Sequence, residues 1–141
     1  MTEIRNNAEL EERIDRMVEE YMQAVDCREN AAPFHSMEHI LETFRFFAGY
    51  GSFILEIEDS GQGGLLMDRM NGYMDQYVAH PGWDFLRRSG IYLYAGALYN
   101  ILIQWLRCRK TEAGQAAEAA LASLAQRVSG LGNEIMRPAH S

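Results

Sequence analysis

The feature that most constrains the fold is a long stretch without charge in the second half of the chain. Residues 90–106, "GIYLYAGALYNILIQWL", contain no charged side chain, and basic residues stand on both sides of them. Such a helix spans roughly 26 Å, whereas a bilayer core needs about 30 Å. Asn100, Gln104 and three tyrosines within it are also unusual for a membrane span. The stretch therefore predicts a helix that is buried by protein on more than one side, with a second subunit covering the side that a small chain leaves open.

Composition narrows the class of protein. A chain of 141 residues is long enough for one domain with its own core. Its 20 acidic and 13 basic residues argue against a nucleic-acid-binding surface on this chain. The N-terminal residues are polar and mostly acidic, which is not typical of a signal peptide. Cys27 and Cys108 show neither pairing nor metal-ligand spacing, so we expect reduced thiols in a cytoplasmic protein.

Apolar residues at helical spacing predict an all-α fold, a bundle of about six helices. No alternating strand pattern and no internal repeat is present in the sequence. Ser36 and Thr111 are suited to cap helices, and Pro81 with Gly82 ends one. The helices are expected at residues 8–26, 37–48, 53–59, 65–79, 84–109 and 112–128.

One motif indicates a metal site. His35, Glu38 and His39 match the H-x-x-E-H pattern of some zinc proteases, in which two histidines grip one ion from the same helix face. Pro33 and the expected cap at Ser36 place His35 outside the helix, however, so the pair does not share a face. A small helical metal-dependent enzyme remains an alternative, and the simpler interpretation is two surface histidines at a helix start.

Methionine and aromatic residues are concentrated between Phe44 and Trp105. Methionine adapts to irregular spaces, and tyrosine combines an apolar body with a polar tip. These residues favour a pocket for a hydrophobic small molecule between the helices at 37–48, 53–58, 65–79 and the start of 84–109. The alternative is that they only fill the core. The candidate ligand-binding residues are Phe44, Phe47, Met70, Tyr73, Met74, Tyr92 and Tyr99.

Residues 37–128 resemble the C-terminal regulatory domain of TetR-family transcriptional regulators. The likeness is most specific in "ALYNILIQWLRCRKT", a long apolar helix followed by a capped alanine-rich helix, "AAEAALASLA". The aromatic helix end, the short "FILEIED" helix and the glycine turn "SGQGG" also match the family pattern. Residues 1–36 depart from it, because they hold one acidic amphipathic helix and no helix-turn-helix.

The resemblance implies an effector-sensing domain whose last two helices pair with a second copy as a four-helix bundle. Residues 1–36 would be a connector helix and loop, 37–130 the regulatory and dimerisation domain, and 131–141 a flexible tail. DNA would be bound only through a domain other than these residues. No catalytic residue, cofactor or metal is expected, and a ligand-free dimerisation module is a further alternative. The expected interface residues are Leu98, Ile101, Trp105, Ala117, Leu121, Leu124 and Val128.

Overall fold

The regular secondary structure is entirely helical. A computed structural model describes residues 7–26, 33–111 and 114–137, and within these ranges there are six α-helices, a short π-helical turn and no strand. The predicted all-α class and the number of helices are confirmed. None of the described helices is both long enough and apolar enough to cross a membrane. The chain divides into two compact units, residues 1–31 and residues 32–141.

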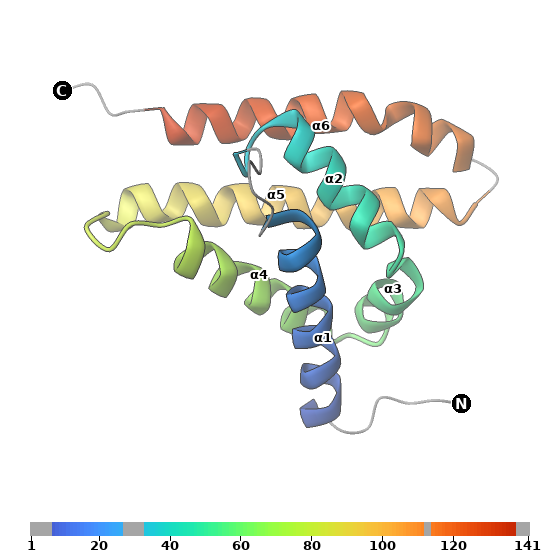
Figure 1. Ribbon diagram of the computed structural model, residues 1–141. Coiled ribbons are helices and arrows are strands. Elements are labelled where there is room, and N and C mark those ends of the chain that lie inside the picture. Colours follow the sequence, from blue (N-terminus) through green and yellow to red (C-terminus); the bar gives the residue numbers. More distant parts are fainter. Residues whose placement is uncertain (1–6, 27–32, 112–113, 138–141) are drawn as a thin grey trace. The chain divides into compact units, whose positions relative to one another are not determined.

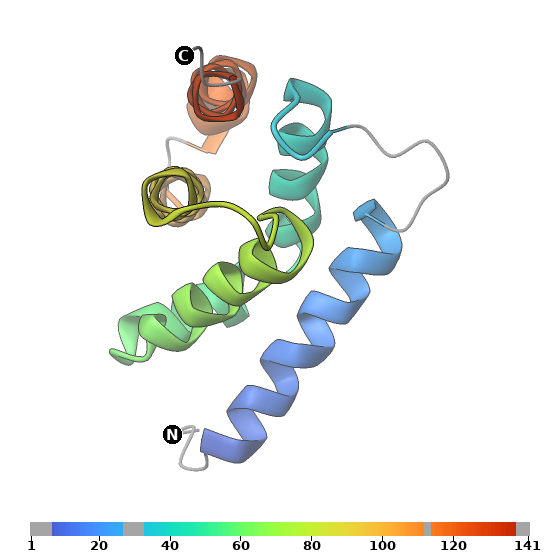
Figure 2. The same ribbon diagram turned by 90° about the vertical axis from the view of Figure 1, so that its left-hand side faces the viewer.

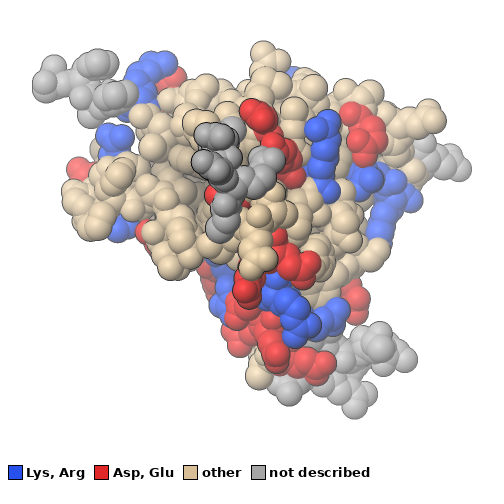
Figure 3. Space-filling view, viewed as in Figure 1, with Lys and Arg blue, Asp and Glu red and all other residues tan. Residues whose placement is uncertain are grey.

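The first unit contains α1 (Asn7–Tyr21), which the π-helical turn η1 (Met22–Asp26) continues. Leu10, Ile14 and Met17 recur at helical spacing along α1 and form its apolar stripe. Acidic and basic side chains cover another part of its surface, as Figure 3 shows in the lower part of the view, where Figure 1 places α1. The predicted first helix is therefore present.

The second unit is built around two long antiparallel helices, α5 and α6, which lie side by side (Figure 1). The shorter helices α2, α3 and α4 all pack on one side of this pair (Figure 2). Among the described residues of this unit, no helix covers the opposite side of the pair. The bounds are α2 (Met37–Ala48), α3 (Gly51–Asp59), α4 (Gly63–Tyr77), α5 (Phe85–Arg109) and α6 (Gly114–Met136).

Local sequence signals account for several helix boundaries. The Ser36 side chain accepts a hydrogen bond from the His39 backbone N–H at 3.1 Å, which caps α2. The Asp84 carboxylate accepts one from the Arg87 backbone N–H at 2.9 Å and caps α5. Gly61, in the turn between α3 and α4, has a φ of 83°, which glycine adopts without strain.

The charge-free stretch of α5, residues 89–106, is buried mainly by its own chain. It packs against α6 on one side and against α3 and α4 on another. Tyr94 and Trp105 are only 1% and 3% exposed, whereas Leu93 on the open side is 62% exposed. Burial of α5 on more than one side is thus confirmed. A chain of this size was expected to cover one side of the helix, whereas α6 covers one side and α3 and α4 cover another. Only a narrow stripe of α5 remains for a partner.

The C-terminal part of α6 corrects a sequence prediction. The helix was expected to end near residue 128 and the tail to fray, but α6 continues to Met136. The reason is tertiary: the Ser129 hydroxyl donates to the His35 carbonyl at 2.7 Å, and the Asn133 side chain meets His35 Nδ1 at 2.7 Å. These bonds hold the turn before α2 against α6. Both partners of these bonds belong to the second compact unit, residues 32–141.

A glycine makes this contact possible and provides a test. A Cβ atom at Gly132 would lie 2.5 Å from the His35 Cβ atom and 2.9 Å from a ring carbon of Tyr94. We expect Gly132→Ala to lower the free energy of unfolding by about 1–3 kcal/mol through overpacking, as measured by urea denaturation. The control is Gly130→Ala, because nothing lies within 4 Å of that position. Gly130→Ala should be neutral or stabilising, since alanine is the better helix former. Equal stability of the two variants would contradict the close contact.

Candidate functional site

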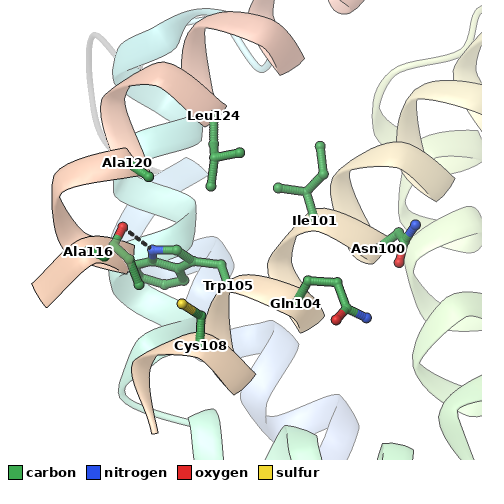
Figure 4. A pocket seen from close by; sticks show the side chains of 9 residues that line it. Asn100, Ile101, Gln104, Trp105, Cys108, Ala116, Ala120 and Leu124 are labelled. Carbon is green, nitrogen blue, oxygen red and sulfur yellow. Dashed lines mark hydrogen bonds between the residues drawn. The ribbon is translucent and has the colours of Figure 1, made fainter. Parts of the chain in front are cut away.

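A groove between α5 and α6 is the candidate site. It has a volume of about 430 Å³ and is open to solvent. Figure 4 shows the side chains that line it. Helix α5 supplies Asn100, Ile101, Gln104, Trp105 and Cys108, and α6 supplies Ala116, Ala117, Ala120 and Leu124. The lining is mostly apolar, with the amides of Asn100 and Gln104 as its polar members.

Trp105 forms the rigid part of the groove. Its indole N–H donates to the Ala117 carbonyl at 3.0 Å, which joins α5 to α6 (Figure 4). The Phe44 ring of α2 packs against the indole, with 5.3 Å between ring centroids. The Arg109 guanidinium lies 4.9 Å from the indole centroid and also pairs with Glu118 at 2.8 Å. Contacts from three helices and a cation–π contact therefore hold the indole in place.

Small side chains create the hollow. Ala116 and Ala120 are exposed on α6, and a methyl group at each position leaves the space above Trp105 unfilled. Ile101 and Leu124 are half-buried and form apolar walls. A 430 Å³ groove of this kind is suited to apolar side chains of another helix or to a small apolar molecule.

The predicted interface residues divide into two groups. Ile101 and Leu124 line the groove and are partly accessible. The other five are buried, and two of them, Trp105 and Ala117, also line the groove. The five are Leu98, Trp105, Ala117, Leu121 and Val128. These five contribute to the core of the monomer, because α5 and α6 pack on each other as well as on the shorter helices. Sequence reasoning did not single out Asn100, Gln104, Cys108 and Leu93 as members of the open side; their helical spacing with Ile101 was the available signal.

The seven predicted ligand-binding residues lie on α2, α4 and α5, away from the groove. Phe44 and Met74 are buried, whereas Phe47, Met70 and Tyr73 are half-buried. Tyr92 and Tyr99 are half-buried on α5, and Tyr99 is about 200° around the helix from the groove residue Ile101. The structure thus brings Phe44 to the back of Trp105, while the two tyrosines of α5 are directed to α3 and α4.

Two tyrosine hydroxyls connect α5 to the shorter helices. The Tyr92 hydroxyl donates to Asp75 of α4 at 2.6 Å, and this hydrogen bond raises the pKa of the Tyr92 phenol. The Tyr99 hydroxyl donates to the Glu58 carboxylate of α3. Burial, followed by this hydrogen bond, raises the pKa of Tyr99. Burial also raises the pKa of Tyr94. These contacts make Tyr92 and Tyr99 attachment points of α3 and α4.

The raised tyrosine pKa values predict a loss of stability at alkaline pH. The folded protein holds the phenol protons of Tyr94 and Tyr99 more tightly than the unfolded chain does. Their stabilising contribution is therefore complete below about pH 10 and is lost as the pH rises through the pKa values of the folded state. We expect a Tyr94→Phe/Tyr99→Phe variant to lose less thermal stability than the wild type above about pH 10, as measured by circular dichroism. Tyr77→Phe, at a 53% exposed position, is the control. An equal alkaline loss in both proteins would refute the assignment.

His35 lies outside the helix, as Pro33 and the cap at Ser36 predicted. His35 precedes α2 and bonds to Asn133, while His39 lies inside the helix. His39 is buried, and its Nδ1 lies 3.4 Å from the Thr43 hydroxyl oxygen, so the expectation of two surface histidines is wrong for His39. His39 and Thr43 are four residues apart and lie on the same buried side of α2. Within residues 7–26, 33–111 and 114–137, no group of three histidine, cysteine or acidic side chains is placed to hold a metal ion.

Comparisons of the chain with protein-family models, with curated proteins and with solved structures find no significant match. The functional interpretation therefore depends on the sequence and on the geometry of the second unit.

Proposed function

We propose that the helices from Met37 to Met136 form the effector-sensing and dimerisation domain of a TetR-like transcriptional regulator. The observation that carries the proposal is the open side of the α5–α6 pair. It combines the charge-free stretch 89–106 of α5, exposed leucines and an alanine-lined groove, whereas the opposite side is covered by α2, α3 and α4. Two long antiparallel helices with one uncovered side are half of a four-helix bundle.

Self-association is the physical argument for the first part of this function. Leu86 and Leu93 are 81% and 62% exposed on the open side of α5. Exposed apolar groups of this kind next to a hollow are typical of protein–protein interfaces. Residues 89–106 carry no charge, so a second copy would meet little electrostatic repulsion there. A homodimer in which each copy supplies α5 and α6 buries both the leucines and the grooves.

Effector sensing is the second part. Helices α3 and α4 attach to α5 through the Glu58–Tyr99 and Asp75–Tyr92 hydrogen bonds, and Arg88 adds an ion pair with Asp75 at 3.6 Å. Polar bonds at half-exposed positions are cheaper to break than buried apolar packing, because water replaces the lost partner. A hydrophobic effector that enters between α4 and α5 would shift these helices and so bias the arrangement of the dimer. DNA binding would then respond through a helix-turn-helix domain other than these residues.

The proposal is tested by the mass of the wild-type chain and by its response to ligands. Sedimentation at micromolar concentration should give twice the chain mass; a strictly monomeric chain would overturn the proposal. A set of hydrophobic small molecules should then include compounds that raise the thermal midpoint. A bound effector at a hundredfold excess over its Kd stabilises by about 2.7 kcal/mol. A dimer that no compound stabilises would refute the sensing part and leave a ligand-free dimerisation module.

A further inference from the structure

The exposed leucines of α5 and the groove have matching spacings. Leu86 and Leu93 lie seven residues apart on the open side of α5, and the groove-lining Ile101 and Cys108 also lie seven residues apart. Seven residues are close to two helical turns, so each pair occupies one side of the helix. Ala97 lies midway, four residues from both Leu93 and Ile101. The projecting side chains of Leu86 and Leu93 therefore lie as far before Ala97 as the groove residues Cys108 and Ile101 lie after it.

We propose that the groove is filled by Leu93 of a second copy, with the two α5 helices antiparallel and crossing at Ala97. This inference rests on the dimer proposed above and specifies how its subunits pair. In this arrangement each residue faces the one that is equally far on the other side of Ala97. Leu93 meets Ile101 of the partner subunit, and Leu86 meets Cys108 of the partner subunit. One twofold axis then fills both grooves at once, as an isologous interface requires.

The residue at the crossing point supports this register. Ala97 is half-buried and small, so two helices can approach closely there. A crossing at Asn100, the next outward-facing residue, would set Leu93 against Arg107 of the partner subunit. A parallel pairing would set Leu93 against its own copy and leave the grooves empty. Of these registers, only the antiparallel crossing at Ala97 brings an exposed leucine onto the hollow.

The charged residues of α5 lie outside the centre of this pairing. The central part of the contact, between Ser89 and Leu106, has no charged residue that could oppose its own copy. The arginines near its ends have partners in their own chain. Arg87 lies over the Trp83 ring, with 4.6 Å between the guanidinium carbon and the ring centroid, and Arg107 pairs with Asp59 at 2.8 Å. Pairing at Ala97 sets Arg87 level with Arg107 of the partner subunit at each end of the contact, outside its charge-free centre, and Arg107 keeps Asp59 of its own chain as its acidic partner there.

Cysteine cross-linking tests the register. Ala97→Cys in a Cys27→Ser/Cys108→Ser background places one thiol at the proposed axis, where it meets its own copy. We expect mild oxidation, or a short bismaleimide, to convert most of the chain to a species of twice the chain mass on a non-reducing gel. Ala122→Cys in the same background is the matched control, because Ala122 is exposed on a different side of α6 from the groove residue Ala120. Equal cross-linking of Ala122→Cys would overturn the register.

A second pair of variants tests the groove itself. Leu86→Cys with Cys108 retained, in a Cys27→Ser background, should give an intermolecular disulfide between positions 86 and 108, identified by mass spectrometry of the peptides. At the crossing angle of about 20° found in four-helix bundles, these positions stay close enough to react. Phe85→Cys, which is one residue away and about 100° around the helix, should not. A dimer that lacks both the position-97 and the 86–108 cross-links overturns the register alone. A monomeric wild type overturns the proposed function as well.

Discussion

Replacement of Trp105 by alanine is expected to remove about 3–5 kcal/mol from the free energy of unfolding. Trp105 is 3% exposed, and its removal leaves a cavity between α5, α6 and α2. The change also leaves the Ala117 carbonyl without its donor. Because small domains have only about 5–15 kcal/mol of stability, the variant should be close to unfolding at room temperature. Urea denaturation followed by circular dichroism at fixed protein concentration measures the loss.

Two variants separate the contributions to this loss. Trp105→Phe keeps an aromatic ring and removes the indole donor, so it should cost less than the alanine variant. Trp83→Ala is the matched control, since Trp83 is half-buried in the turn before α5, where its ring contacts His80 and Arg87. We expect a cost below about 1 kcal/mol for Trp83→Ala. A similar loss in Trp83→Ala and Trp105→Ala would contradict the role of Trp105 as the fixed part of the groove.

Ala120→Glu is expected to weaken dimerisation at least a hundredfold, or about 2.7 kcal/mol. Ala120 lines the groove and is exposed in the single chain, so the change leaves the monomer intact. In a twofold dimer the substitution enters the interface twice and buries two carboxylates without partners. Sedimentation across a range of concentrations gives the dissociation constant. Leu98→Glu and Leu121→Glu are unsuitable for this purpose, because both leucines are buried in the monomer.

The control for this prediction lies two residues away on the same helix. Ala122→Glu adds the same charge to α6 at an exposed position about 200° around the helix from Ala120. It should leave the dissociation constant within a few fold of the wild type. If Ala122→Glu dissociates the dimer and Ala120→Glu does not, the groove side of the α5–α6 pair is not the dimer interface.

The sequence by itself determined the helices of this protein. The caps at Ser36 and Asp84, the glycine turn at Gly61 and the apolar periodicity are local signals, and the observed bounds of α2 to α5 lie within about two residues of the predicted ones. The apolarity of α5 likewise indicated burial on more than one side. These features were predictable because capping bonds and helical periodicity involve residues only a few positions apart in the chain.

Only the tertiary structure decided how the faces of these helices are used. The C-terminal end of α6 is helical because Ser129 bonds to His35, which is 94 residues away, and no local pattern contains that contact. The attachment of Tyr99 to Glu58 likewise joins residues that are 41 positions apart in the chain. A seven-residue spacing shows which side chains of α5 share a face, but not which neighbouring helix covers that face. That choice buried five of the seven expected interface residues. It also set Trp105 and Ala117 among these five, together with the more accessible Ile101, Leu124, Ala116 and Ala120, around a groove.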